Sequence, residues 1–208
     1  MDFSSAVTAF VTLFVIIDPI GLTPIFVALT RGLPARERRA IALRAGLVAA
    51  GLLTLFGLLG EAVLSFVGIS MPAFRIAGGL LLFLTAIDML FERRTPRREG
   101  QAHAGDDPSV FPLAMPLIAG PGAMATMILL AGQTGGDPAG LAAVHGVMLA
   151  VLLVVFALFQ FAGLLERALG PTGVNVVTRL LGMLLAALAV QFVLDGLSAF
   201  GFGGGGGG

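Results

Sequence analysis

The sequence predicts an all-α membrane protein with six transmembrane helices, arranged as two inverted three-helix repeats. Three observations predict this fold: the composition, six long apolar stretches and the placement of arginine. Of the 208 residues, 57% are hydrophobic and 12% are charged, which is about half the charged share of a soluble domain. No part of the chain is polar enough for a separate soluble domain, so residues 1–208 are expected to form one transmembrane domain.

A membrane-spanning helix needs about 20 predominantly apolar residues, and six stretches meet this requirement. They cover about residues 5–28, 41–67, 72–90, 110–131, 141–164 and 176–200. The start of the chain has no positively charged segment before the first stretch and no small-residue cleavage site after it. The first stretch is therefore predicted to span the membrane and not to be a signal peptide. The longest connection, about residues 92–109, is polar. The Gly-rich tail, residues 201–208, is assigned no function.

Arginine predicts the orientation of these helices. It occurs in the connections after the first, third and fifth stretches and is absent from those after the second and fourth. Because positive residues stay on the cytoplasmic side of a membrane, both termini are predicted to lie outside the cytoplasm of a bacterial inner membrane. The arginines in these connections are Arg31, Arg36, Arg38, Arg39, Arg93, Arg94, Arg97, Arg98 and Arg167.

The two halves of the chain, about residues 5–91 and 110–200, resemble each other weakly. When Arg75 is aligned with Arg179, a glycine and several leucines coincide in the residues that follow. The first helix of each half also carries a cluster of Pro and Gly. Because each half has three helices, the second half must insert upside down, which is the arrangement of many secondary transporters.

The first helix contains the sequence DPIGLTP, residues 18–24, beyond its midpoint. Pro19 and Pro24 remove backbone donors and clash with the preceding turn, so the helix is predicted to break here. Unpaired backbone groups within the membrane are tolerated only beside protein or a polar cavity, and Asp18 adds an ionisable group, which is usually functional at such depth. Asp18, Pro19, Gly21 and Thr23 are therefore candidate substrate-binding residues; the alternative is a proline kink with Asp18 near the headgroups.

The fourth helix contains the sequence PLAMPLIAGPG, which cannot form one regular helix. A half-helix that starts after this sequence would direct free N–H groups and a positive dipole end at the bundle centre, which suits a carboxylate. The alternative is a purely structural bend. The candidate substrate-binding residues of this segment are Gly120, Pro121, Gly122, Ala123 and Thr126.

Three further polar residues are candidates. Arg75 and Arg179 are expected either to act in gating or ion pairing, with Glu61 and Glu166 as possible partners, or to reach the headgroups. Gln191 lies inside an apolar run of the sixth helix. It is expected to be either a substrate contact or an interhelical hydrogen-bond partner.

The chain contains no Cys and none of the usual catalytic or nucleotide-binding motifs. His103 and His145 have no metal-ligand spacing. We therefore expect no enzyme activity, no cofactor, no metal and no nucleic-acid partner. Any active transport would have to be driven by an ion gradient, with H⁺ or Na⁺ as the coupling ion.

Four segments together resemble the MarC-related family of bacterial inner-membrane proteins: DPIGLTPIF, FRIAGGLLLFLTAIDML, PLAMPLIAGPGAMATMI and AVQFVLDG. The resemblance covers roughly residues 5–200. It implies six helices and, for at least some members, transport of small neutral amino acids such as glycine and alanine. Many members carry Asn at the position of Asp18. An amide can coordinate a substrate but cannot carry a proton, so a protonation role for Asp18 would not be general to the family, while a substrate role stays open. If Asp18 is protonatable, it is a candidate proton carrier.

The first functional hypothesis is thus secondary transport of a small neutral amino acid by alternating access. Asp18 would hold the ammonium group of the substrate, and the N–H groups near Gly120–Ala123 would hold its carboxylate. Two alternatives remain: an exporter of drugs or other metabolites, and a membrane protein that assists a partner without transporting. A scaffold has no need to expose backbone within the membrane, which argues against the last.

Overall fold

The computed structural model describes residues 3–91 and 108–201, and every element within these ranges is helical. The polar connection and the Gly-rich tail that the sequence indicates lie almost entirely outside the described residues. The elements, in chain order, are α1 (Phe3–Ile17), α2 (Pro19–Leu29), α3 (Ala35–Val67), α4 (Met71–Leu90), η1 (Ser109–Ile118), α6 (Pro121–Gly132), α7 (Pro138–Gln160) and α8 (Ala162–Ala199).

Five helical segments are long and apolar enough to cross a membrane, with α1 and α2 together forming the first of them. A sixth results if η1 and α6, which are bent by 57° relative to each other, are taken as one span. These segments coincide with the six apolar stretches of the sequence. The prediction of an all-helical membrane fold is confirmed.

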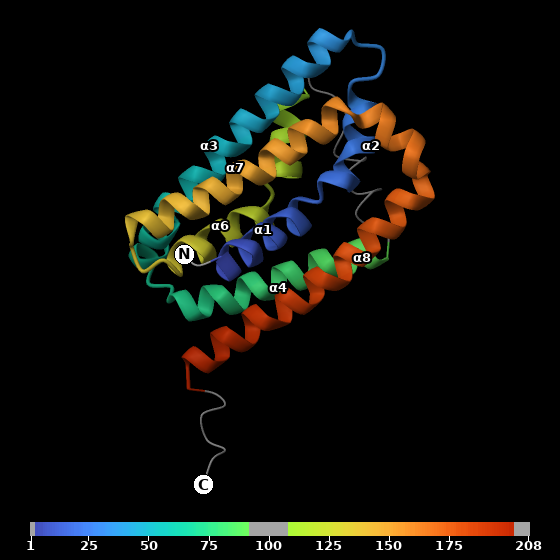
Figure 1. Cartoon of the computed structure of the whole chain (residues 1–208). Helices are drawn as coiled ribbons and strands as arrows, with labels where there is room; N and C mark the ends of the chain where they lie inside the picture. The colour runs from blue at the N-terminus through green and yellow to red at the C-terminus, as the bar shows by residue number, and fades with distance from the viewer. Residues whose placement is uncertain (1–2, 92–107, 202–208) are drawn as a thin grey trace.

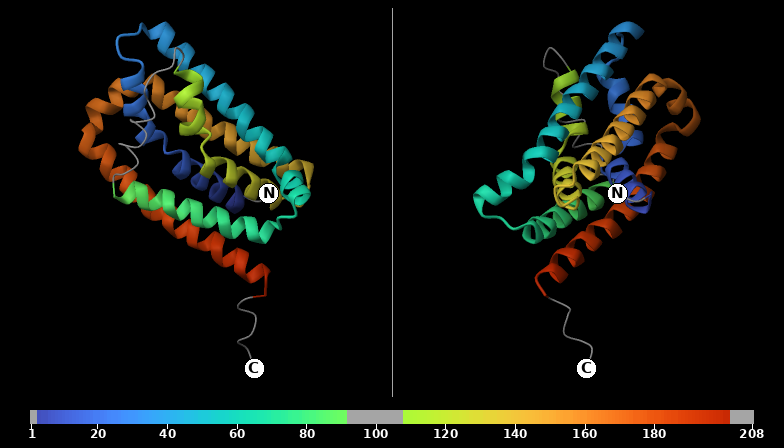
Figure 2. Two further views of the ribbon diagram at one scale, coloured as in Figure 1. Left: turned by 180° about the vertical axis from the view of Figure 1, so that it is seen from behind. Right: turned by 60° about the vertical axis from the view of Figure 1, so that its left-hand side comes forward.

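The first span and α6 occupy the centre of the bundle. Figures 1 and 2 show α1 and α6 side by side, with α3 and α7 along one side and α4 and α8 along the other. In the most apolar part of the first span, 61% of the residues are buried, against 22% in α3 and 28% in α4, α7 and α8. Residues of α1, α2, η1 and α6 therefore meet inside the protein, while the other helices turn one face outward.

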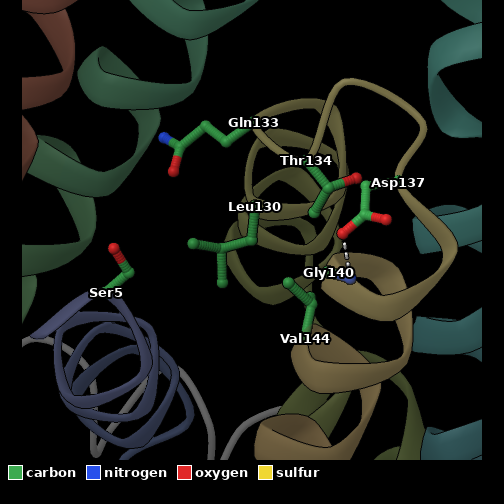
Figure 3. Close-up of a pocket in the computed structure, with 7 residues that line it drawn as sticks. All are labelled: Ser5, Leu130, Gln133, Thr134, Asp137, Gly140 and Val144. Atoms are coloured by element: carbon green, nitrogen blue, oxygen red, sulfur yellow. Dashed lines mark hydrogen bonds between the residues drawn. The ribbon is translucent and has the colours of Figure 1, made fainter. Parts of the chain in front are cut away.

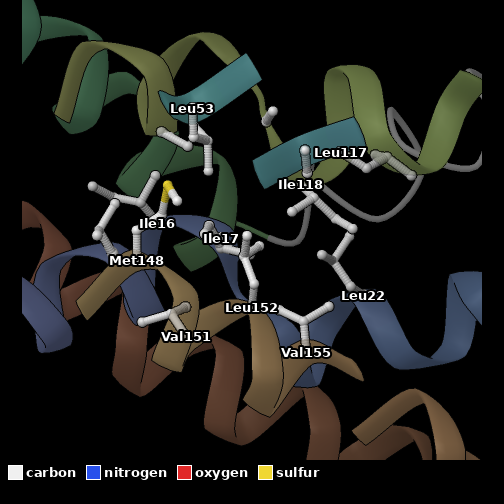
Figure 4. Close-up of a cluster of buried hydrophobic side chains, with 14 of the residues drawn as sticks. Ile16, Ile17, Leu22, Leu53, Leu117, Ile118, Met148, Val151, Leu152 and Val155 are labelled. Atoms are coloured by element: carbon white, nitrogen blue, oxygen red, sulfur yellow. The ribbon is translucent and has the colours of Figure 1, made fainter. Parts of the chain in front are cut away.

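The core is a cluster of branched apolar side chains from most of the helices. Figure 4 shows Ile17 and Leu22, which flank Asp18, in one cluster with Leu53 of α3, Ile118 of η1 and Val155 of α7. In lipid, apolar burial alone does not favour helix association, so close packing of small residues matters more. The contact between α4 and α8 depends on such residues, Gly79 and Gly182 among them.

The last third of the chain differs from the prediction. A connection was expected between about residues 164 and 176, but α7 ends at Gln160 and α8 begins at Ala162. The expected connection is helical except at Gly170, where φ is +60° and ψ is 177° and Pro171 follows. The segment before Gly170 is rich in helix formers (Leu, Glu, Arg and Ala), and glycine takes this positive φ without a Cβ clash. Arg179 lies about two turns into the helical segment that follows this kink.

The ends of the helices gather in two groups. The start of α1, the turn between α3 and α4, the turn between α6 and α7 and the end of α8 lie at one end of the bundle (Figures 1 and 2). The ends of α2 and α7 and the start of α3 lie at the other. We call these the terminal end and the arginine end, the latter because Arg31, Arg36, Arg38 and Arg39 lie there.

Candidate functional site

The junction between α1 and α2 is a single residue, Asp18. Its backbone is left-handed, with φ 56° and ψ 64°, a conformation that Asp and Asn tolerate better than most residues. Pro19 starts α2 at the position where proline's fixed φ and missing N–H fit a helix. The carboxylate caps α2, because Oδ1 of Asp18 accepts a hydrogen bond of 3.0 Å from the N–H of Gly21. Asp18 is 1% exposed.

The residues after Asp18 leave room for this carboxylate. A Cβ at Gly21 would collide with the carboxylate of Asp18, so glycine is required here for the cap to form. Thr23 is buried, and its hydroxyl donates to the carbonyl of Pro19 at 2.9 Å. The hydroxyl hydrogen of Thr23 is therefore bonded within α2, so this hydroxyl could act toward another group only as a hydrogen-bond acceptor.

The junction between η1 and α6 lies in the other interrupted segment. Phe111 and Met115 have extended backbone within η1, and each precedes a proline. Gly120 is extended, and α6 begins at Pro121 without a side-chain cap. The first N–H groups of α6, those of Gly122 and Ala123, therefore lack intrahelical acceptors. The positive end of the α6 dipole lies at the same place.

The two junctions are close in space. A Cβ added at Gly122 would lie 3.4 Å from Cγ2 of Ile16, two residues before Asp18, and 3.3 Å from Cδ2 of Leu82. Ile17, Leu22 and Ile118 belong to one buried cluster. The carboxylate cap of α2 and the uncapped start of α6 therefore belong to the same part of the interior.

Thr126 lies one turn beyond Gly122 on α6 and shares its face. The residue is fully buried, and its hydroxyl has no hydrogen-bond partner among the described residues. A buried polar group without a partner is uncommon in proteins and calls for an explanation. Gly122, Ala123 and Thr126 thus add two N–H groups and one hydroxyl to a single helix start. Of these residues, Ala123 and Thr126 are buried, Gly120 and Gly122 are half-buried, and Pro121 is exposed.

Asp18 is the one Asp, Glu, Lys or Arg in residues 3–29, 109–132 and 138–160. Ile16, Ile17 and Leu22, its neighbours along the chain, belong to the buried apolar cluster. A charge in such a medium interacts strongly with any opposite charge that enters, because little solvent screens it.

The other candidate residues do not meet at this site. Gln191 is exposed, and its Nε2 donates to Oδ1 of Asp195 at 2.7 Å, which is a bond within α8 and not between helices. The buried face of α8 carries Leu185, Ala189 and Phe192 instead, and Gln191 lies on the opposite face.

The two arginines differ from each other. Arg75 is half-buried on α4, its Nε has no partner, and no ion pair joins it to the exposed Glu61 within the described residues. Arg179 is exposed on α8. The structure therefore brings neither arginine to the two junctions.

A pocket of about 260 Å³ opens at the terminal end of the bundle (Figure 3). Asp137 caps α7 there, because its Oδ2 accepts a hydrogen bond of 2.7 Å from the N–H of Gly140. Leu130 lines the pocket two turns beyond Gly122 on α6, so α6 leads from the pocket toward the two junctions. The sequence analysis did not identify this pocket. Its lining residues are Ser5, Leu130, Gln133, Thr134, Asp137, Gly140 and Val144.

His145 is a further candidate residue, which metal-ligand spacing alone does not reveal. It lies seven residues after the start of α7 and faces α3 and α6, where a Cβ at Gly57 would lie 3.1 Å from its Nε2. Its position inside an apolar helix could have marked it, since ionisable residues at membrane depth are usually functional. Within the described residues, no group of three or more His, Asp or Glu side chains could hold a metal ion.

Comparisons with known proteins agree with this fold. Residues 3–200 match the model of a family described as MarC family integral membrane protein. A UPF0056 membrane protein of Archaeoglobus fulgidus is 39% identical over 194 residues, covering 91% of each chain. One from Aquifex aeolicus is 36% identical, covering 92% of this chain and 91% of the relative. The UPF0056 inner membrane protein YhgN of Escherichia coli is 36% identical, covering 92% and 95%. No solved structure matches the chain.

Proposed function

The chain belongs to the MarC family of integral membrane proteins, and on that premise we propose that it is a secondary transporter of small neutral amino acids. Glycine and alanine are the substrates that fit best. The observation that carries the proposal is the fully buried Asp18 beside the uncapped start of α6. A carboxylate and a helix N-terminus recognise the two opposite charges that every free amino acid carries.

In this proposal Asp18 holds the ammonium group of the substrate. The cap bond to Gly21 fixes one carboxylate oxygen, and the carboxylate as a whole supplies the negative charge. A charge-assisted hydrogen bond is roughly twice as strong as a neutral one, and burial removes the competing water. The ammonium group of the substrate thereby brings an opposite charge to a buried carboxylate.

The start of α6 holds the carboxylate of the substrate. The N–H groups of Gly122 and Ala123 are free of intrahelical bonds, and the hydroxyl of Thr126 lies one turn further on. Ile16 and Leu82 approach Gly122 closely. A substrate with more than a very small side chain would collide with them, which favours glycine and alanine over larger amino acids and over drug-sized molecules.

The two ends of the bundle suit alternating access. The pocket at the terminal end would be the entrance on that side, because Leu130 of α6 lines it. At the arginine end, the rings of Phe26 and Phe159 stack with centroids 4.3 Å apart and planes 1° apart, and the guanidinium of Arg38 lies 5.7 Å from the Phe26 centroid. This stack would close the cytoplasmic side in an outward-open state. The two halves of the chain would rock as inverted repeats, with both termini outside the cytoplasm.

Uptake into proteoliposomes tests the proposal. Vesicles that contain the purified chain are expected to take up labelled glycine or alanine saturably, and an imposed H⁺ or Na⁺ gradient should drive accumulation. Leucine should compete poorly because of its size. Absence of saturable uptake of both amino acids, with or without a gradient, would contradict the proposal. Transport confined to larger amphipathic compounds would instead support the drug-exporter alternative.

Gly122→Val is predicted to weaken glycine binding about tenfold or more, equivalent to about 1.4 kcal/mol. The added methyl groups would enter the space beside Ile16 and Leu82 and cover the N–H groups at the start of α6. Equilibrium binding of labelled glycine to the purified protein measures the effect. Gly46→Val is the matched control, because a side chain at Gly46 meets nothing within 4 Å. Equal affinity in the two variants would contradict the role given to α6.

A further inference from the structure

His145 has an unused nitrogen in the interior of the bundle. Its Nδ1 lies 2.8 Å from the carbonyl oxygen of Leu141. Because a carbonyl can only accept, Nδ1 must carry the hydrogen of that bond, which leaves Nε2 of a neutral ring as a bare acceptor. Nε2 is buried and has no hydrogen-bond partner among the described residues.

The space around Nε2 is shaped by two neighbouring helices. Gly57 of α3 has no side chain, and a Cβ there would lie 3.1 Å from Nε2 and 3.1 Å from Cε of Met127 on α6. The imidazole therefore lies where α3, α6 and α7 meet. Met127 follows Thr126 directly, so the same stretch of α6 approaches Gly57 beside His145 and carries the unpartnered hydroxyl.

Few charged side chains lie on these three helices near His145. Helix α6 has no ionisable side chain, and α7 has none besides His145, although Asp137 caps its start. In the half of α3 that runs from Gly57 to Val67, Glu61 is the one charged side chain, one turn from Gly57. The arginines of α3 lie at the opposite end of that helix. Two carboxylates and no cation thus lie in this part of the three helices.

We propose that Nε2 of His145 is the binding site for the coupling proton of transport. The inference rests on the proposed function and selects H⁺ over Na⁺, since an imidazole beside a thioether offers no oxygen ligands to a sodium ion. The proton adds to the lone pair of Nε2, and the Nδ1–H bond to Leu141 is kept. Asp18 is then free to hold the ammonium group of the substrate and need not carry the proton.

Protonation would act on the substrate site through α6. A positive charge on His145 appears against Met127 and lies inside the bundle without a facing carboxylate in contact. The interface between α6 and α7 must then loosen or admit water or Glu61, and each of these moves the segment that carries Gly122, Ala123 and Thr126. Proton binding and substrate binding would thereby become linked.

Nitrogen NMR of the purified protein tests the proton site without any substrate. The sequence has two histidines, so His103→Gln leaves His145 as the single imidazole signal. On acidification, the Nε2 resonance is expected to move reversibly from a bare-acceptor to a protonated position, while Nδ1 stays protonated. A resonance that stays in one state at every pH at which the protein remains folded would overturn the proposal.

Gly57→Ala places a methyl group next to Nε2 of His145. The added methyl group would crowd Nε2, so the protonated fraction of His145 at a given pH should be lower than in the wild type. Gly51→Ala is the control on the same helix, since a Cβ there meets nothing within 4 Å. An unchanged protonated fraction in Gly57→Ala would mean that Nε2 does not take the proton.

Transport measurements on His145→Gln distinguish a loss of proton coupling from a loss of the folded structure. The variant should exchange internal for external glycine at equal pH, at a rate within about twofold of the wild type, and lose accumulation driven by a pH gradient. Accumulation equal to that of the wild type would overturn the proposal, and so would loss of exchange in a protein that still binds glycine. If the wild type takes up no amino acid, the proposed function fails, while the NMR titration still decides whether Nε2 binds a proton.

Discussion

Asp18→Ala is expected to abolish saturable binding and uptake of glycine. The substitution removes the negative charge that faces the ammonium group of the substrate and the cap of α2. Loss of one partner from a buried charge pair costs about 2–5 kcal/mol, and each 1.4 kcal/mol is a tenfold change in affinity. The apparent affinity should therefore fall by about 30-fold to several thousand-fold, measured by equilibrium binding and by initial rates of uptake.

Two further variants separate the effect of the Asp18 charge from the effect of its hydrogen bond to the start of α2. Asp18→Asn keeps an oxygen that can accept from Gly21 but has no charge, so its binding should fall between that of the wild type and that of Asp18→Ala. Asp195→Asn removes a carboxylate that is bound to Gln191 on the outside of α8 and should bind glycine as the wild type does. Wild-type affinity in Asp18→Ala would remove Asp18 from the site.

Gly79→Val is expected to produce the largest loss of stability. A Cβ at Gly79 would lie 2.8 Å from the carbonyl oxygen of Ala189 and 2.8 Å from Cγ2 of Val193. Because the first neighbour is backbone, α4 and α8 must move apart. Overpacking of this kind costs about 1–3 kcal/mol, which for a chain of this length corresponds to a fall in Tm of roughly 3–10 °C.

The loss should be visible as a lower temperature at which half of the detergent-solubilised protein leaves the monodisperse peak in size-exclusion chromatography. Gly51→Val makes the same chemical change on the exposed side of α3, where nothing lies within 4 Å. Its Tm should stay close to that of the wild type, because surface changes are usually within about 0.5 kcal/mol. Equal melting of both variants would mean that α4 and α8 do not pack as described.

The spans could be predicted from the sequence because hydrocarbon imposes one strong rule on a chain, a length of about 20 apolar residues. The side of each helix that faces the protein interior could not be predicted from the sequence. In lipid the outer face of a helix is as apolar as its inner face, so nothing in the run around Gln191 reveals that its side chain points outward. His145 was missed because metal spacing was the criterion applied to it.

Geometry at the junctions also lay beyond sequence reasoning. Pro19 and Pro121 indicate where regular helix is disfavoured, but not that Asp18 adopts a left-handed backbone and caps α2 itself. The closeness of Gly122 to Ile16 depends on how α6 packs against α1. A loop was expected after the fifth helix. Instead the chain is helical on both sides of Gly170, and the kink occurs at this one residue.

The most direct test measures the distance between the bound substrate and Asp18. In membranes, solid-state NMR of protein labelled with ¹³C at the aspartate carboxyl groups and bound to ¹⁵N-glycine reports their dipolar coupling. One carboxyl signal is predicted to couple to the glycine nitrogen over about 3–4 Å, the distance from the carboxyl carbon to the nitrogen across a charge-assisted hydrogen bond, and the coupling should vanish in Asp18→Asn. Bound glycine without coupling to any aspartate, or with coupling that survives Asp18→Asn, would contradict the assignment of Asp18 as the ammonium site.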